Sequence, residues 1–367
     1  MGRWLLTVLG LGLAVLFGWL TVRSVDWAAA WHAFAAARWG FLALCVPLLL
    51  SSIFFRALRW RLILAAHPGA RFTPLLLAAG VGVGGNAILP GKLGEAVAAH
   101  ALGRLADLSR IQALGIQVIT RVVDLLVLFA LVLGASLVLP GLAMRSLRYL
   151  SGSIVVVATL VLVLPLVFRA GWAAGLQGLM RDAVRRAFGA GVLDVAQKFG
   201  RGLASAGQLR LLVAFVLGTA LLWLVLAASL YVALQAFGIQ LSPLVAPLIL
   251  GLIAASAMLP SAPGNVGTFH YFGLLALGVV GVEPGLAAAC IITYHALDML
   301  SALALGAVCA ALAGAPLLVV WKPPPEVVVQ KSALAAGLVH AGTPLPGSEA
   351  SARAGGAAPL TVTTEAV

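Results

Sequence analysis

The chain has 367 residues, of which 62% are hydrophobic and 9% charged, with a mean hydropathy of +1.11 and a formal net charge of +12. A soluble domain carries about 25% charged residues, so the composition excludes an ordinary soluble protein and predicts an all-α, polytopic membrane protein. The basic residues lie between apolar runs, as in loops that face anionic lipid, so the positive charge does not indicate nucleic-acid binding.

Long apolar runs recur along the chain, and their lengths predict membrane-spanning helices. They cover residues 4–21, 39–55, 111–139, 153–168, 211–237 and 286–318. The first run resembles a signal peptide, but "TVRSVDW" (21–27) offers no small-residue cleavage site, which favours an uncleaved helix. Cys45, Cys290 and Cys309 all lie in apolar segments, which indicates buried, inert thiols and no disulfide framework.

Two polar interruptions break the apolar pattern, "NAILPGKLGE" (86–95) and "SAMLPSAPGNVGTFH" (256–270). Each has Leu-Pro followed by a Gly-x-x-Gly, a pattern that also occurs in helices that merely kink. Gly and Pro free backbone groups that only protein or water can satisfy inside a bilayer, and a broken helix directs its positive end toward anions. We therefore expect two re-entrant hairpins, at 71–104 and 242–283, that hold a polar ligand at membrane depth.

The distribution of basic residues predicts the orientation. With both termini in the cytoplasm, the inner side receives 17 of the 23 basic residues and the outer side receives four, which are Arg23, Arg38, Arg145 and Arg148. The inner set is Arg3, Arg56, Arg59, Arg61, Arg71, Arg104, Arg110, Arg169, Arg181, Arg185, Arg186, Lys198, Arg201, Arg210, Lys322, Lys331 and Arg353. The two hairpins then enter from opposite sides, as in transporters with inverted repeats, although pairs of full crossings would give the same sides.

The chain resembles the flippase-like membrane domain family, also called the lysylphosphatidylglycerol synthase transmembrane family. The resemblance covers most of 39–318 and rests on "RALRWRLIL" (56–64), "NAILPGKLGE", "TRVVDLL" (120–126) and "LPSAPGNVGTF" (259–269). It implies a membrane protein that moves a lipid across the bilayer. Larger members add a soluble domain that attaches lysine to phosphatidylglycerol; here residues 322–367 form a Pro-, Ala- and Gly-rich segment that we expect to be a disordered cytoplasmic tail after a membrane domain at 1–321.

The chain departs from the family pattern at four positions. Lys92 stands where the family usually has Arg, and Ala98 replaces the Arg that commonly follows the Glu. In the second interruption Asn265 replaces a Gly, and His270 stands where a Glu is expected. These differences change the charge of the expected pocket, so the resemblance does not identify the lipid.

Ionisable side chains at membrane depth are costly and indicate functional sites. Lys92 and Glu95 are one helical turn apart, as are Arg121 and Asp124. Each pair either neutralises itself or lines a cavity, with Lys92 facing a lipid phosphate and Glu95 facing a cationic headgroup or the other hairpin. Asn86 is expected to cap the broken helix. The full set of predicted substrate-binding residues is Asn86, Pro90, Lys92, Gly94, Glu95, Arg121, Asp124, Pro263, Gly264, Asn265, Gly267, His270, Tyr294, His295 and Asp298.

Tyr294, His295 and Asp298 form a polar stripe on the last apolar run. With His270 and Glu95 the stripe offers metal-ligand types, but no HExxH or CxxC spacing accompanies them, so we expect neither a metal site nor a cofactor. A proton-coupled role for the two histidines is the alternative.

The function favoured by the sequence is a lipid translocase of the bacterial inner membrane, not an enzyme, which binds an anionic or aminoacylated phospholipid or a related polar lipid. Two alternatives stay open: an integral-membrane transferase acting on a lipid-linked substrate, and an accessory subunit of a lipid or hopanoid pathway. A transferase needs paired acids or a nucleophile with its base, whereas Glu95, Asp124 and Asp298 come from three segments. The basic loop 169–210 is predicted to form amphipathic helices on the inner leaflet or to recruit a lipid-modifying enzyme.

Overall fold

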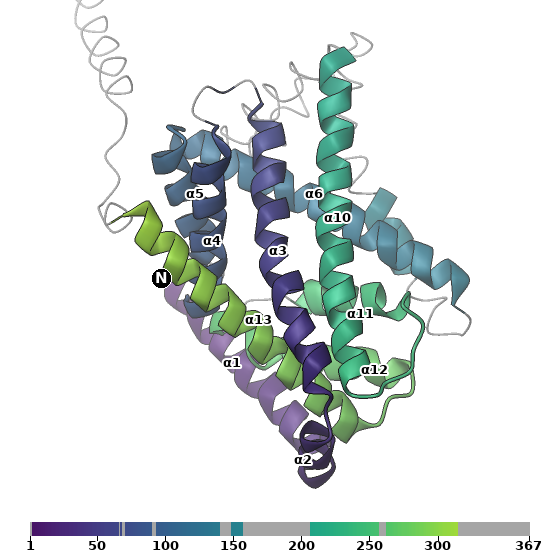
Figure 1. Ribbon diagram of the computed structural model, residues 1–367. Coiled ribbons are helices and arrows are strands. Elements are labelled where there is room, and N and C mark those ends of the chain that lie inside the picture. The colour runs from purple at the N-terminus through teal and green to yellow at the C-terminus, as the bar shows by residue number, and fades with distance from the viewer. Residues whose placement is uncertain are drawn as a thin grey trace, which may run out of the picture. The chain divides into compact units, whose positions relative to one another are not determined.

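The computed structural model describes residues 2–65, 67, 70–89, 93–139, 148–156, 206–256 and 262–314, and every regular element in these ranges is helical. The all-α fold predicted from composition is therefore confirmed for the described part of the chain (Figure 1). The elements are α1 (Gly2–Ser24), α2 (Trp27–Ala35), α3 (Trp39–Ile63), α4 (Phe72–Ile88), α5 (Leu93–Leu105), α6 (Arg110–Val138), α10 (Ala206–Ala236), α11 (Val245–Ser256), the short 3-10 helix η3 (Pro263–Asn265), α12 (Thr268–Val279) and α13 (Pro284–Ala313).

Four described helices, α3, α6, α10 and α13, are long and apolar enough to cross a membrane, which confirms four of the predicted spans. The first predicted span is α1, which meets α2 at a bend of 83°, and together they satisfy the same test. Of the predicted span 153–168, only residues 153–156 are described, and they are helical. The chain is a multi-pass helical membrane protein.

Side-chain caps explain where several helices begin. The Ser109 hydroxyl accepts from the Gln112 backbone N–H while the Gln112 side chain accepts from the Ser109 N–H, a capping box that starts α6. The Glu283 carboxylate accepts from the N–H groups of Gly285 and Leu286 at 2.8 and 2.9 Å, and Pro284 follows it as the first residue of α13. These signals are local, so the sequence carries them directly.

Helices α3 and α10 pack against each other in antiparallel directions. The Arg38 N–H, which precedes α3, donates to the Ala236 carbonyl at the end of α10 at 2.9 Å. Apolar side chains fill the space between these helices and α11, α12 and α13, and Leu230, Leu234 and Cys290 are fully covered there. All three cysteines are buried free thiols, as predicted.

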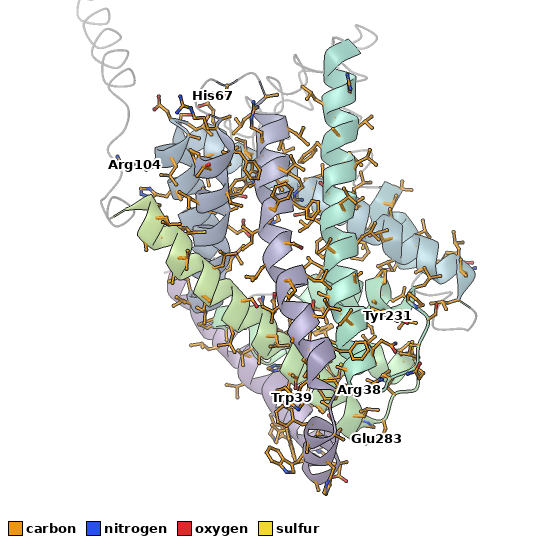
Figure 2. The ribbon with its side chains drawn as sticks, viewed as in Figure 1. Arg38, Trp39, His67, Arg104, Tyr231 and Glu283 are labelled. Atoms are coloured by element: carbon orange, nitrogen blue, oxygen red, sulfur yellow. The ribbon has the colours of Figure 1, made fainter. Side chains whose placement is uncertain are left out.

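The two hairpins join the α3–α10 pair at opposite ends. The first, α4–α5, follows the end of α3, and the second, α11–η3–α12, follows the end of α10. Because α3 and α10 are antiparallel, these two attachment points lie at opposite ends of the pair. Figure 2 shows His67 and Arg104 of the first hairpin region at one end, and Arg38 and Glu283 at the other.

Helix α4 packs closely on α13 because both helices carry glycine at their crossing. A Cβ added at Gly84 would lie 2.8 Å from the Gly306 Cα, and one added at Gly306 would lie 2.6 Å from the Gly84 Cα. No side chain fits at either position, so the first hairpin lies against α13 along its backbone. This contact fixes one side of the hairpin, and its other side faces α3 and α6.

Several predictions concern residues outside the described ranges. They include Pro90, Gly91 and Lys92, most of the basic loop 169–210, and the tail 322–367. The boundary between the membrane domain and the tail, and the amphipathic character of the loop, stay predictions.

Candidate functional site

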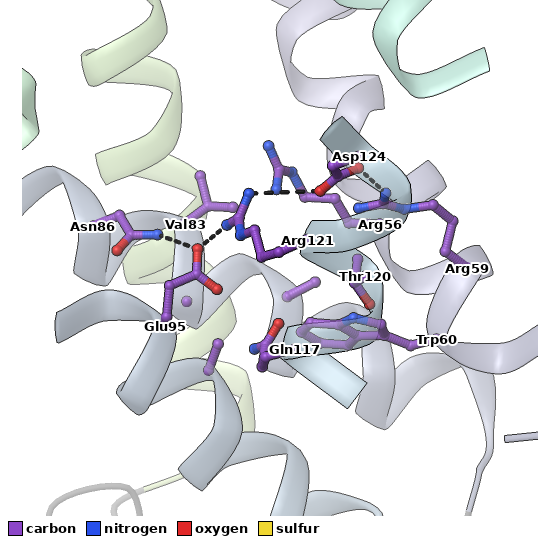
Figure 3. Close-up of a pocket in the computed structure, with 13 residues that line it drawn as sticks. Arg56, Arg59, Trp60, Val83, Asn86, Glu95, Gln117, Thr120, Arg121 and Asp124 are labelled. Carbon is purple, nitrogen blue, oxygen red and sulfur yellow. Dashed lines mark hydrogen bonds and ion pairs between the residues drawn. The ribbon is translucent and has the colours of Figure 1, made fainter. Parts of the chain in front are cut away.

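A cavity lies between α3, α4, α5 and α6 and is lined by charged and polar side chains (Figure 3). Its lining consists of Arg56, Arg59, Trp60, Ala79, Gly82, Val83, Asn86, Glu95, Ala98, Gln117, Thr120, Arg121 and Asp124. It leaves about 20 Å³ for the centres of water molecules, which is space for about one water. In this conformation the cavity is too small to hold a lipid headgroup.

Helix α6 contributes a polar stripe to the cavity. Gln117, Thr120, Arg121 and Asp124 are spaced so that they share one face of the helix. The Thr120 hydroxyl donates to the Ile116 carbonyl at 2.6 Å, so its donor is used within the helix. A helix that is apolar on its remaining faces thus directs its polar residues inward.

A row of ion pairs crosses the cavity from α4 to α3. Asn86 donates from its Nδ2 to Glu95 Oε1 at 3.2 Å, and Glu95 forms an ion pair with Arg121. Arg121 also lies 3.5 Å from Asp124 Oδ2, and Asp124 forms an ion pair with Arg59 (Figure 3). The row connects four helices through side chains that are costly to place in a membrane.

Arg59 is the most deeply buried member of this row, with 1% of its side chain exposed. The predicted span ended at Phe55, whereas α3 continues to Ile63 and Arg59 is buried inside the protein. The ion pair with Asp124 makes this burial tolerable. Trp223 of α10 donates from its Nε1 to Asp124 Oδ1 at 3.2 Å, so α10 also supports the pair.

Arg56, one turn before Arg59, forms no ion pair with any described residue. Its Nε is buried and has no hydrogen-bond partner among those residues. It lies within electrostatic range of Arg59 and Arg121. The cavity lining therefore holds three guanidinium groups against the two carboxylates of Glu95 and Asp124.

The second hairpin is held by two histidine side chains. His295 lies 2.9 Å through Nε2 from the Gly264 carbonyl and 3.0 Å through Nδ1 from His270 Nε2. A carbonyl only accepts, so His295 donates to it from Nε2. The His295 ring stacks on Phe269, with centroids 4.0 Å apart and planes 7° from parallel. The histidines thus fasten α12 and η3 to α13.

Left-handed backbone conformations form the break in the second hairpin. Gly264, Asn265 and Gly267 have φ angles of +64°, +58° and +87°. Glycine adopts this region without a Cβ penalty, and Asn tolerates it better than most residues. At Gly264 an added Cβ would lie 3.3 Å from the Ala87 carbonyl of α4, so the second break reaches the end of α4. Gly267 lies instead against the backbone of Ala14 in α1.

The structure divides the predicted site residues between these two places. Asn86, Glu95, Arg121 and Asp124 belong to the cavity, and the cap role expected for Asn86 is wrong, because it lies inside α4 and binds Glu95. The Arg121–Asp124 contact is present, and each residue has a further partner from another helix. Gly94 lies against Asn86, where an added Cβ would clash.

Of the other predicted residues, Pro90 and Lys92 lie outside the described ranges, and the rest lie in the second hairpin or on α13. Pro263, Gly264, Asn265 and Gly267 form its break, and His270 and His295 secure it. The hydroxyl of Tyr294 lies 2.9 Å from that of Ser229 on α10. Asp298 is half-buried, is not among the cavity-lining residues, and lies within electrostatic range of Arg56.

Sequence reasoning missed Arg56, Arg59, Trp60 and Gln117 as members of the site. A signal was available, because Arg56 and Arg59 directly continue an apolar run and are spaced to share a helix face with it. Among the residues that the structure describes, no group of three or more His, Cys, Asp or Glu side chains is arranged to hold a metal ion.

The chain was compared with known proteins. The model of one protein family, described as the lysylphosphatidylglycerol synthase TM region, matches residues 7–306. No curated protein and no solved structure matches the chain. The matched residues include both hairpins and every residue that lines the cavity.

Proposed function

Since this chain belongs to the family of the lysylphosphatidylglycerol synthase TM region, we propose that it binds a polar lipid headgroup in the cavity between α3, α4, α5 and α6 and moves that lipid between leaflets. Membership makes it a membrane protein associated with lipid handling. The proposal adds that the protein moves the lipid between leaflets and that the headgroup binds in this cavity.

The observation that carries the proposal is the row of charges that links Glu95, Arg121, Asp124 and Arg59 inside an apolar helical protein. A single ion pair would suffice to neutralise one buried charge, whereas here five charged side chains line one cavity. Replacing buried ion pairs by apolar side chains is often neutral or stabilising. Stability alone therefore does not account for this cluster, and ligand binding does.

The unequal exposure of the charged side chains suggests how the headgroup is admitted. Arg121 and Glu95 keep 43% and 24% of their side chains exposed, while Arg59 and Asp124 keep 1% and 6%. The Glu95–Arg121 pair is thus the part of the row that a ligand reaches first. We expect the first hairpin to move away from α3 and α6 when the headgroup enters, with Arg121 exchanging Glu95 for the ligand.

The two hairpins support an inverted-repeat mechanism. They join the antiparallel α3–α10 pair at opposite ends, and the break of the second reaches the end of α4. In such transporters broken helices from two oppositely oriented halves meet near the ligand, and the halves rock around it. We propose that movement of either hairpin opens the cavity to one leaflet.

We also propose that the protein resides in the cell membrane with both termini in the cytoplasm. Arg56 and Arg59 line the cavity, so they no longer count as loop charges; taking both from the 17 predicted inner residues leaves 15, against four outer ones. The bias still favours this orientation. Labelling a cysteine introduced in the tail 322–367 with a membrane-impermeant reagent, in intact cells, tests it: labelling from outside would reverse the assignment.

Transport in proteoliposomes tests the main proposal. The purified full chain is reconstituted with phosphatidylglycerol carrying a fluorophore on its acyl chain, and a membrane-impermeant quencher reports the lipid that reaches the outer leaflet. We expect faster exchange than in protein-free liposomes. Arg121→Gln should slow it by about ten- to a hundredfold, the effect of losing one charge-assisted hydrogen bond. Arg104→Gln is the matched control, because Arg104 is an exposed residue of α5.

The same liposomes separate translocation from the transferase alternative. A transferase changes the mass of its lipid substrate, which mass spectrometry of the extracted lipids detects. Unmodified lipid that equilibrates between leaflets supports the proposal. Modified lipid, or no exchange by a folded protein with any lipid tested, would reject it.

A further inference from the structure

The cavity contains more hydrogen-bond donors than the protein satisfies. Four nitrogen atoms of its lining are buried without a hydrogen-bond partner among the described residues: Arg56 Nε, Arg59 Nε, Trp60 Nε1 and Gln117 Nε2. Asn86 Oδ1 is a fifth buried atom in the same condition, and it is an acceptor. Unsatisfied buried polar groups are rare in folded proteins and need a specific explanation.

Three of the four unsatisfied nitrogens are donors whichever way the side-chain amides are turned. The amides of Gln117 and Asn86 can exchange their oxygen and nitrogen atoms, whereas arginine and tryptophan nitrogens only donate. The unsatisfied donors of Arg56, Arg59 and Trp60 come from one helix, α3, and all line the same cavity. A ligand that completes this site must bring acceptors.

The acidic side chains of the cavity already bind guanidinium groups. Asp124 accepts from Arg59 and Trp223 and pairs with Arg121, and Glu95 accepts from Arg121 and Asn86. The three guanidinium groups then leave a surplus of one positive charge on the lining. Asp298, the acid within electrostatic range of Arg56, is not among the lining residues.

From these observations we infer that the cavity selects an anionic, phosphate-bearing headgroup without an ammonium group, such as that of phosphatidylglycerol, over its lysine-bearing derivative. The inference rests on the proposed function, because it names the substrate class of the same site. Phosphate oxygens accept several hydrogen bonds at once and pair favourably with arginine. They satisfy the donors of α3 and neutralise the surplus charge together.

An ammonium group has the opposite requirements. It brings three donors and no acceptor, and the one unsatisfied acceptor of the described lining is Asn86 Oδ1. At Glu95 or Asp124 it competes with a guanidinium that already binds the carboxylate, and a displaced guanidinium would leave its positive charge unpaired inside the protein, which is strongly destabilising. The same pocket therefore attracts phosphate and disfavours lysine.

Binding measurements on the purified full chain in detergent test the selectivity. The probes are short-chain phosphatidylglycerol, lysylphosphatidylglycerol, phosphatidylcholine and inorganic phosphate, each titrated while binding is followed by thermophoresis. We expect phosphatidylglycerol to bind at least about tenfold more tightly than either ammonium-bearing lipid, the effect of about one unmade charge-assisted contact. Equal or tighter binding of lysylphosphatidylglycerol would overturn the inference. Inorganic phosphate binding as tightly as phosphatidylglycerol would also overturn the assignment of a lipid headgroup.

Two variants of α3 test the cause. Trp60→Phe removes one unsatisfied donor without changing charge, so the lipid-free protein should stay as stable or become more stable while phosphatidylglycerol binds about three- to tenfold more weakly. Arg56→Gln should abolish the discrimination against lysine, and Arg56→Lys should restore most of it because it restores the charge. The inference is wrong if Trp60→Phe leaves the affinity for phosphatidylglycerol unchanged, because the unsatisfied donors then do not bind the lipid. It is also wrong if Arg56→Gln still discriminates against lysylphosphatidylglycerol, because the surplus positive charge then does not set the selectivity.

The transport assay keeps the two proposals apart. Selective binding of phosphatidylglycerol without exchange between leaflets would reject translocation and retain the inferred site. Exchange of all lipids at equal rates, together with unselective binding, would retain translocation and reject the inferred selectivity. Arg104→Gln should match the unchanged protein in both measurements, since this side chain is exposed and does not line the cavity.

Discussion

The two hairpins break their helices in similar sequence patterns but are stabilised by different chemistry. Around the first, Glu95 joins a row of charged side chains that continues through Arg121 and Asp124 to α3. Around the second, His295 receives no ion pair from described residues and instead binds the Gly264 carbonyl and His270. The first break adjoins charge that a ligand can use, and the second is a backbone turn held in place.

This difference separates binding from support. Charged groups cost free energy in a membrane and are retained where they act on something. A hydrogen bond from a histidine to a carbonyl satisfies a backbone acceptor that the break releases, so it stabilises the fold by itself. We therefore expect changes at the first hairpin to alter lipid binding, and changes at the second to alter stability more than selectivity.

The largest effect is expected from Asp124→Ala. It leaves Arg59, of which 1% is exposed, without its carboxylate, and it removes a partner of Arg121. Stranding a buried charge costs about 3–5 kcal/mol, so the variant should lose most of its folded yield. Thermal unfolding and gel filtration of the detergent-purified protein measure this. The double variant Arg59→Met with Asp124→Leu should recover much of the yield; a single variant that unfolds like the unchanged protein would contradict burial of the pair.

A smaller loss of stability is expected from Gly264→Ala in the second hairpin. Its φ of +64° disfavours alanine, and the added Cβ would displace the Met299 side chain near the Ala87 carbonyl. Left-handed strain and crowding together cost about 2 kcal/mol. The melting temperature should fall while the preference among lipids stays the same. Gly278→Ala in α12 is the matched control, because no atom lies within 4 Å of its added Cβ; a changed lipid preference in Gly264→Ala would place ligand at the second break.

Glu95→Gln should show the reverse pattern. Glu95 and Arg121 are partly exposed, at 24% and 43%, so their ion pair contributes about 1 kcal/mol or less to stability. The rate of lipid exchange between leaflets, however, should change strongly. Arg121 loses the carboxylate that it is proposed to exchange for the headgroup. The double variant Glu95→Gln with Arg121→Met distinguishes the roles. A folded double variant that transports normally would assign both residues to helix support only.

The sequence predicted the polar character of this region better than its connections. Broken helices, membrane-depth charges and cap residues are local signals, and Glu95, Arg121 and Asp124 were identified from spacing alone. Pairing between helices is not local. One of the two open interpretations paired Glu95 with its sequence neighbour Lys92, which lies outside the described residues; the ion-pair partner of Glu95 among the described residues is Arg121, 26 positions away.

Arg59 shows why the remainder of the site was missed. A basic residue at the end of an apolar run normally marks the membrane surface, and only its partner on α6 explains why this arginine is buried. Asn86 was misjudged for the same reason. A local role as a helix cap was expected from its position in the sequence, whereas its side chain donates a hydrogen bond to Glu95 on the other helix of the hairpin. Pairing across helices decides both cases, and one sequence does not contain it.

The smallest effect is expected from Tyr294→Phe, which tests whether the polar stripe of α13 takes part in lipid selection. The Ser229 hydroxyl donates to the Leu226 carbonyl at 2.8 Å, so it accepts from the Tyr294 hydroxyl 2.9 Å away. Removing that donor leaves Ser229 with its backbone partner, and the lost bond is worth about 0.5–1 kcal/mol. A double-mutant cycle with Ser229→Ala, followed by thermal unfolding, should return a coupling energy of this size.

Lipid affinity and selectivity should not change, because Tyr294 is buried against Phe269 and does not line the cavity. A loss of lipid binding at unchanged stability would extend the headgroup site from the first hairpin to α13 and remove the distinction between the two hairpins.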